Sequence, residues 1–258
     1  MPYEIMKGGE PFLFEADDTA CLLIHGFGGS PMEMKYLGEY LASKGITTHG
    51  VRLAGHATSP YDLEKTTWKD WYQSAVEGFE KLKNMGMKKI FVAGLSLGGL
   101  LTLYLAENNK DIDGIITMSS PAAMDEMEFR IIPIVDVFVD YVNLKMLGLE
   151  KKEFDLPHIQ YDTLPMPAIR ELIRFSKIVE KDLSKVTAPA LIVHSLRDKT
   201  IAFHEAVEIA TKISSEIRFL YILRESDHAV TLDKEREELY KVIEFFIKQD
   251  YSILKPKE

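Results

Sequence analysis

Short apolar runs alternate with amphipathic stretches along most of this chain, and this alternation restricts the possible folds more than any other feature. Apolar runs bounded by turn residues predict buried strands, at 20–29, 46–53, 88–94, 112–120, 188–198 and 217–228. Apolar residues at helical spacing predict helices, at 30–45, 66–86, 97–108, 203–214 and 234–249. Strands that alternate with helices form a mostly parallel sheet with helices on both faces. The sequence therefore predicts an α/β fold, with residues 10–17 as an antiparallel edge strand.

Residues 121–185 interrupt this alternation with an apolar first part, several prolines (Pro133, Pro157, Pro165 and Pro167 among them) and a helical last part. We expect a small helical cap inserted into an α/β core made of residues 1–120 and 186–258. Insertions of this kind lie over the clefts of α/β folds. We predict that Met124, Met127 and Phe129 line the substrate pocket. The alternative is that this segment only packs on the core.

Local signals predict where several helices begin and end. Ser30 is a predicted N-cap with Pro31 in the first turn, and Thr67 is a second predicted N-cap. Gly45 is expected to end the helix that follows Ser30. Asp233 is expected to start the last helix.

The strand predicted at 88–94 runs into Gly94-Leu95-Ser96-Leu97-Gly98, and a predicted helix follows at once. In a strand–Gly-x-Ser-x-Gly–helix unit, the glycines let the strand and the helix approach each other. The serine is then exposed at the carboxyl end of the strand, beside the N–H groups of a helix N-terminus. We predict that Ser96 is a nucleophile. An ordinary glycine-rich turn is the alternative.

A serine hydroxyl needs a base to become a useful nucleophile, and the base needs an acid that orients it. Asp198 and then His228 follow predicted strands downstream of Ser96, which is the order of one known triad arrangement. Parallel strands bring their carboxyl ends to one edge, where such sheets bind ligands. Asp227 is a poorer acid because adjacent side chains usually diverge. His194 is expected to be a core histidine bonded to backbone.

Acyl transfer also needs two donors aimed at the oxyanion of the tetrahedral intermediate. The N–H of Leu97, directly after the serine, is one predicted donor. The N–H of Phe27 is the other, in the glycine-rich loop "HGFGG" at 25–29. We expect His25 to brace this loop and not to transfer protons.

Charge and cysteine content exclude some classes of partner. The net charge is −9 over 258 residues, which disfavours nucleic acid and anionic membrane surfaces. Cys21 is the only cysteine, so no internal disulfide can form. The N-terminus has no apolar stretch of signal-peptide length, and no stretch has the uncharged length of a membrane span, so we expect a cytoplasmic protein without stable membrane insertion. We expect a monomer or homodimer without metal or cofactor.

Five stretches make the chain resemble the α/β-hydrolase carboxylesterases and monoacylglycerol lipases of bacteria, in particular the small thermostable carboxylesterases. They are "LLIHGFGGSPMEM", "GLSLGG", "LIVHSLRDKTI", "SDHAVTLDKEREELYKVIEFF" and "GHATSP", the last with Ala57 where the family usually has glycine. The resemblance implies the α/β-hydrolase fold. It also implies a triad of Ser96, Asp198 and His228 and an oxyanion hole of Phe27 and Leu97.

We therefore expect a serine hydrolase for small-molecule esters of short-to-medium acyl chains, including monoacylglycerols, with an acyl-enzyme on Ser96. A thioesterase or a C–C hydrolase with the same triad is the alternative. A non-catalytic binding module that kept the fold is a third reading.

Overall fold

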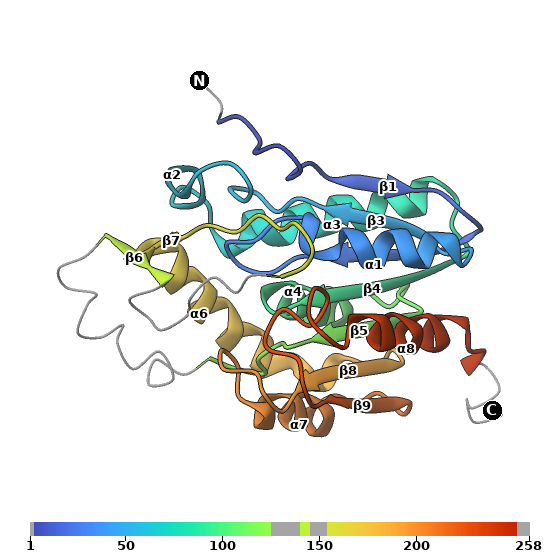
Figure 1. Cartoon of the computed structure of the whole chain (residues 1–258). Helices are drawn as coiled ribbons and strands as arrows, with labels where there is room; N and C mark the ends of the chain where they lie inside the picture. Colours follow the sequence, from blue (N-terminus) through green and yellow to red (C-terminus); the bar gives the residue numbers. More distant parts are fainter. Residues whose placement is uncertain (1–2, 125–139, 145–153, 252–258) are drawn as a thin grey trace.

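The computed structural model describes residues 3–124, 140–144 and 154–251 (Figure 1). Its centre is a seven-stranded sheet in the order β1-β3-β2-β4-β5-β8-β9. The strands are β1 (Phe12–Phe14), β2 (Thr19–Ile24), β3 (Thr47–Val51), β4 (Lys89–Leu95), β5 (Gly114–Met118), β8 (Ala190–Ser195) and β9 (Arg218–Leu223). Only the β1–β3 pair of this sheet is antiparallel. The predicted α/β class and the antiparallel edge strand are confirmed.

Helices cover both faces of the sheet (Figure 1). They are α1 (Met32–Ser43), α2 (Pro60–Leu63), α3 (Trp68–Asn84), α4 (Leu97–Asn108), α6 (Met166–Asp182), α7 (Phe203–Lys212) and α8 (Arg236–Lys248), with a 3-10 turn, η2, at Leu183–Lys185. Helices α3, α4 and α7 pack on one face, with α6 against α4, while α1 and α8 pack on the other. None of these described helices is long and apolar enough to cross a membrane.

The two faces of the sheet carry separate hydrophobic clusters. Successive strand residues point to opposite faces, so Leu22 joins the cluster under α3 and α4, and Leu23 joins the cluster under α1 and α8. Because both faces are buried, the central strands read as unbroken apolar runs in the sequence. Cys21 is fully buried in the second cluster.

The last strand differs from its neighbours. Phe219 is 50% exposed and Ile222 is 42% exposed, although 217–228 reads as a buried strand in the sequence. The reason is position, because β9 pairs only with β8 and forms the free edge of the sheet. An apolar run identifies a strand but does not fix its place in the sheet order.

Helix ends agree with the sequence signals at some positions and differ at others. Thr67 caps α3, and the Asp70 carboxylate accepts its backbone N–H at 2.8 Å. Gly45, just after α1, has φ +85°. The prediction for Ser30 is wrong, because the N-cap of α1 is Pro31 and no side chain caps this helix. Asp233 does not start α8, which begins at Arg236.

The region 121–185 contains more than the predicted helix. Strands β6 (Tyr141–Asn143) and β7 (Thr163–Pro165) form a two-stranded antiparallel sheet, which the sequence pattern did not reveal. The helix α6 follows β7 directly and covers most of the predicted helical last part. The division into a core and a cap at 121–185 stays a prediction.

Candidate active site

Ser96 joins β4 to α4 in a left-handed backbone conformation, with φ +54° and ψ −115°. Two glycines make this tight turn possible. A Cβ on Gly94 would lie 2.0 Å from the carbonyl oxygen of Gly98, and a Cβ on Gly98 would lie 2.2 Å from the carbonyl oxygen of Ile24. The helix therefore packs closer to β4 and β2 than any side chain at these positions allows. Ser96 is left partly exposed at the carboxyl end of β4.

Two backbone N–H groups near Ser96 are available as donors. Leu97 is the first residue of α4, where an N–H has no helical acceptor. Phe27 lies in the loop between β2 and α1, and β2 pairs directly with β4. Neither N–H is paired with an acceptor in the described ranges. A Cβ on Gly26 would lie 3.6 Å from Ser96 Cβ, so the loop that carries Phe27 passes against the serine.

His25 is a structural brace for this loop, as expected. Its Nε2 accepts the backbone N–H of Leu53 at 3.1 Å, so the ring proton lies on Nδ1. Nδ1 donates to the carbonyl oxygen of Gly26 at 2.9 Å. Burial and the nearby His56 hold the pKa of His25 well below its usual range, so the ring is neutral. Both ring nitrogens are occupied, which leaves His25 no proton to transfer.

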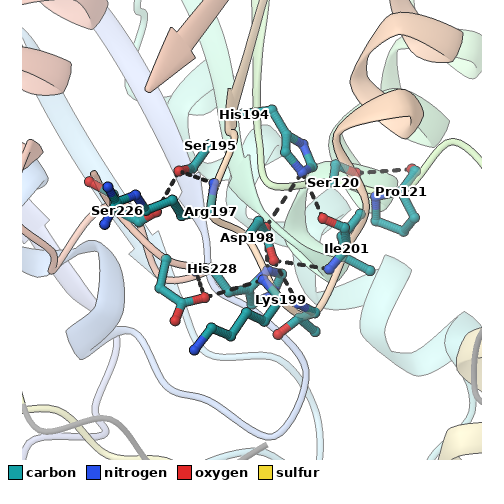
Figure 2. A network of polar contacts seen from close by, with 12 residues as sticks. Ser120, Pro121, His194, Ser195, Arg197, Asp198, Lys199, Ile201, Ser226 and His228 are labelled. Carbon is teal, nitrogen blue, oxygen red and sulfur yellow. Dashed lines mark hydrogen bonds and ion pairs between the residues drawn. The ribbon is translucent and has the colours of Figure 1, made fainter. Parts of the chain in front are cut away.

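Asp198 and His228 meet at the carboxyl ends of β8 and β9 (Figure 2). The Nδ1 of His228 donates to Asp198 Oδ2 at 2.9 Å. Asp198 Oδ1 accepts two backbone N–H groups, from Thr200 at 2.8 Å and from Ile201 at 2.9 Å. Both carboxylate oxygens are thereby fixed, and the remaining ring nitrogen of His228 is free to act as a base. The Asp198 side chain is fully buried, while that of His228 is 23% exposed.

Asp198 and His228 each shift the pKa of the other toward its charged form. Burial alone raises the pKa of Asp198, but the His228 ring and the two backbone N–H donors bring it below its usual value. Burial alone lowers the pKa of His228, but Asp198, Glu33 and Asp227 raise it above its usual value. The ion pair form is therefore favoured once the histidine accepts a proton.

Neighbouring groups hold the two loops of this pair together. His194 Nε2 lies 3.0 Å from the carbonyl oxygen of Ile201 and 3.5 Å from Asp198 Oδ2 (Figure 2). Ser195 Oγ donates to the carbonyl oxygen of Ser226, which ties the end of β8 to the loop of His228. His194 is thus a buried histidine bonded to backbone, as expected, and it also contacts the acid.

Asp227 and Asp233 serve the backbone of the histidine loop. Asp227 Oδ1 accepts the N–H of His228 at 2.9 Å and the N–H of Lys199 at 3.3 Å. Asp233 Oδ2 accepts the N–H of Asp227 at 2.7 Å. Neither carboxylate bonds the His228 ring, so Asp198 is the acid that the ring contacts.

The three candidate side chains come from one edge of the sheet, because Ser96, Asp198 and His228 follow β4, β8 and β9. Ser96 Oγ makes no hydrogen bond to a described residue. Catalytic hydrogen bonds are often loose before substrate binds and tighten in the complex. The site therefore contains a partly exposed serine hydroxyl, an oriented imidazole and two backbone N–H groups that are unpaired in the described ranges. Acyl transfer by a serine uses groups of these kinds.

The short segment 161–164, just before α6, reaches back to the loops around the serine. The N–H of Tyr161 donates to the carbonyl oxygen of Gly28 at 2.8 Å. Tyr161 OH donates to the carbonyl oxygen of Gly55 at 2.9 Å and accepts the N–H of Thr58 at 2.7 Å. Leu164 occupies the space beside Gly28, where a Cβ would lie 2.7 Å from its Cδ2. This segment therefore covers the loop that carries Phe27.

The predicted pocket residues have different outcomes. Met124 is only 4% exposed and belongs to the same hydrophobic cluster as Leu97, Tyr161 and Leu164. Its N–H donates to Ser176 Oγ on α6 at 3.0 Å. Its role in substrate binding stays a prediction. Met127 and Phe129 lie outside the described residues.

Glu33 is a site residue that the sequence analysis missed. Its carboxylate is buried under the "HGFGG" loop and accepts the N–H of Gly26 at 2.9 Å. The local signal was the spacing Ser30-x-x-Glu33, which is that of a capping box. A capping box would pair the Glu33 side chain with the backbone N–H of Ser30. The carboxylate instead accepts the N–H of Gly26, in the loop that precedes the helix.

Comparisons with known proteins identify the family of this chain. Residues 15–235 match the Hydrolase_4 family model, described as serine aminopeptidase, S33. The chain is similar to the thermostable monoacylglycerol lipase of Bacillus sp. (strain H-257), with 36% identity over 252 residues, which cover 95% of this chain and 97% of the relative. It is also similar to the carboxylesterase of Bacillus subtilis (strain 168), with 30% identity over 243 residues, which cover 94% of this chain and 98% of the relative.

A solved structure from work on LipS and LipT, two metagenome-derived lipolytic enzymes, has a similar fold. It superposes with a TM-score of 0.88 at 28% sequence identity, covering 96% of this chain and 100% of that chain. These matches confirm the resemblance that the sequence motifs indicated.

Proposed function

Since the chain belongs to the Hydrolase_4 family of α/β-hydrolases, we propose that it is a carboxylic-ester hydrolase with Ser96, Asp198 and His228 as its catalytic triad. The observation that carries this proposal is the arrangement at the sheet edge. A strained, partly exposed serine follows β4, and an Asp198–His228 pair with a 2.9 Å hydrogen bond follows β8 and β9.

Acylation follows from these positions. The free Nε2 of His228 takes the proton of Ser96 Oγ as the oxygen attacks the ester carbonyl. The carbonyl oxygen becomes an oxyanion that accepts the N–H groups of Phe27 and Leu97. Asp198 keeps the proton of His228 on Nδ1 and stabilises the imidazolium. The imidazolium then gives its proton to the leaving alcohol, and the acyl group stays on Ser96.

Deacylation repeats the steps with water in place of the serine. His228 takes a proton from water, and the resulting hydroxide attacks the acyl carbonyl. The second oxyanion uses the same two N–H donors. The proton returns to Ser96 Oγ as the acid product leaves.

The proposed substrates are small-molecule esters of short-to-medium acyl chains, including monoacylglycerols. Two relatives support this class, because their names state a monoacylglycerol lipase and a carboxylesterase. Apolar pocket walls suit acyl chains, since each CH₂ taken out of water contributes about 0.8 kcal/mol. We propose that Met124, Met127 and Phe129 contribute to this wall.

A fluorophosphonate probe tests the nucleophile directly. We expect the wild-type chain to be labelled once, on the peptide that contains Ser96, and Ser96→Ala to be neither labelled nor active on nitrophenyl esters. Ser43→Ala is the matched control, because Ser43 is a serine on the surface helix α1. Labelling of another serine, with Ser96 unmodified, would disprove the assignment.

Substrate panels separate the remaining alternatives. A nitrophenyl ester series, acyl thioesters, ring-cleavage products and an aminoacyl anilide compare an esterase with a thioesterase, a C–C hydrolase and an aminopeptidase. We expect the highest kcat/KM with esters. A non-catalytic binding module would leave every substrate intact and the probe unreacted.

The proposed partners and location follow from the chain's charge and composition. A net charge of −9 supports the absence of nucleic acid partners. We propose a monomer or homodimer in the cytoplasm, to be tested by light scattering and cell fractionation.

A further inference from the structure

Glu33 lies on the first turn of α1, with its side chain turned toward the loop that carries Phe27. The residue is 8% exposed, and its Oε2 accepts the N–H of Gly26 at 2.9 Å. The loop has room for this carboxylate because Gly29 lacks a side chain. A Cβ on Gly29 would lie 2.1 Å from Glu33 Oε1.

Glu33 and His25 hold the two peptide planes on either side of Gly26. Glu33 holds the plane between His25 and Gly26 through the N–H of Gly26. His25 holds the next plane through the carbonyl oxygen of Gly26. That second plane contains the N–H of Phe27, which points opposite to the carbonyl because the peptide is planar and trans. The direction of the proposed oxyanion donor is thus set by two buried side chains.

Gly26 lies between the carboxylate and the nucleophile. A Cβ at this position would be 3.3 Å from Glu33 Oε2 and 3.6 Å from Ser96 Cβ. A shift of the Gly26 backbone therefore moves the loop relative to the serine. Misplacing a reacting group by about 1 Å can lower a rate about 100-fold.

The charge of Glu33 also reaches the histidine. Burial raises the pKa of Glu33 to about 7, and the hydrogen bond from Gly26 and the His228 ring act in the opposite direction. His228 in turn faces Asp198, Glu33 and Asp227, all of which raise its pKa, and neutral His194 lies nearby. Glu33 is thus a second carboxylate acting on the imidazolium, without a hydrogen bond to it in the described ranges.

We propose that Glu33 is a positioning residue for ester hydrolysis. A side-chain oxygen of Glu33 accepts the N–H of Gly26 and so fixes the peptide before Gly26, which aims the Phe27 N–H at the oxyanion. In its ionised form, the same side chain also stabilises protonated His228. The proposal rests on the ester hydrolase function and on Ser96 as its nucleophile.

Two substitutions separate the hydrogen bond from the charge. Glu33→Gln keeps an acceptor oxygen for Gly26 and removes the charge. We expect its kcat at high pH to stay within about threefold of wild type, while the acidic limb of kcat/KM moves to lower pH because His228 loses a stabilising carboxylate. Glu33→Ala removes both the acceptor and the charge. We expect a loss of about 10–100-fold in kcat with KM within about threefold.

A boronic acid transition-state analogue gives an independent readout. We expect its inhibition constant to rise for Glu33→Ala by about the factor lost in kcat, and to change little for Glu33→Gln. Glu39→Ala is the control, because Glu39 lies on the same helix with its side chain 51% exposed. Circular dichroism and thermal melting report whether each variant folds.

Several results would overturn the proposal. They are a Glu33→Ala variant with wild-type kcat, a loss confined to KM, or a Glu33→Gln variant as impaired as Glu33→Ala with an unmoved pH limb. If Glu33→Ala does not fold, the pH limb of Glu33→Gln decides. A wild-type chain that neither cleaves esters nor reacts with fluorophosphonate contradicts the proposed function instead, so the two failures are distinguishable.

Discussion

Replacing the strained Ser96 with glycine should make the protein more stable while removing its proposed nucleophile. Ser96 has φ +54° and ψ −115°, a conformation that costs a non-glycine residue about 1–3 kcal/mol. Glycine relieves this strain but gives the unfolded chain more freedom, which costs about 0.5–1 kcal/mol. The expected net gain in the free energy of unfolding of Ser96→Gly is about 1 kcal/mol, or about 2–4 °C in Tm for a chain of this size.

Ser96→Ala is the matched control for the strain, because alanine keeps the Cβ. Ser96 Oγ makes no hydrogen bond to a described residue, so removing it should change stability by less than about 0.5 kcal/mol. Urea unfolding and calorimetry compare the free energy of unfolding of the wild type, Ser96→Gly and Ser96→Ala. Neither variant should be labelled by a fluorophosphonate, which verifies that each lacks the Ser96 hydroxyl. If Ser96→Gly were no more stable than Ser96→Ala, the backbone at this turn would not be strained, and the reasoning would fail.

The remaining expectations concern the acid, the base, the elbow and the cap. Asp198→Asn should lower kcat about 10⁴-fold because His228 loses its tautomer control, whereas Asp227→Asn, which still accepts backbone N–H groups, should stay within about tenfold; the reverse order in esterase kinetics would exchange their roles. Because the pKa of His228 is raised, kcat/KM should increase with pH through a midpoint above about 6.5; a pH–rate profile with a lower midpoint contradicts this. Gly98→Ala should yield little folded protein or activity, since its Cβ would lie 2.2 Å from a carbonyl oxygen; a fully active, folded variant would refute it. Met124→Ala should shift the preferred acyl length in a nitrophenyl ester series, and an unchanged optimum would show that this side chain is packing alone.

Local sequence patterns determined most of the framework of the site. The elbow at Ser96 could be predicted because the two glycines it needs lie two residues before and two residues after it, and this spacing carries the steric requirement. Asp198 and His228 could be placed together because each follows an apolar run, and parallel strands bring such ends to one edge. Ala57 stands where the resembling family usually has glycine, and its φ of +54° shows why glycine suits that turn.

Local sequence patterns did not predict the contacts between segments that lie far apart along the chain. Tyr161 forms hydrogen bonds with Gly55 and Thr58, which lie more than a hundred residues away in the sequence. Strands β6 and β7 pair with each other although about twenty residues separate them along the chain. Glu33 shows the same limit at short range. Its spacing from Ser30 satisfies a capping pattern, yet its carboxylate bonds Gly26.

The physical difference lies in what each kind of feature depends on. Backbone torsions, strand burial and turns depend on neighbouring residues. The sequence by itself therefore determined the elbow and the order along the chain of the seven strands of the main sheet and of helices α1, α3, α4, α7 and α8. A buried carboxylate binds whichever N–H the fold leaves unpaired beside it, and an edge strand such as β9 stays exposed because no strand pairs with its free side. Only the tertiary structure decided those partners, because they depend on how the helices and loops pack around the sheet.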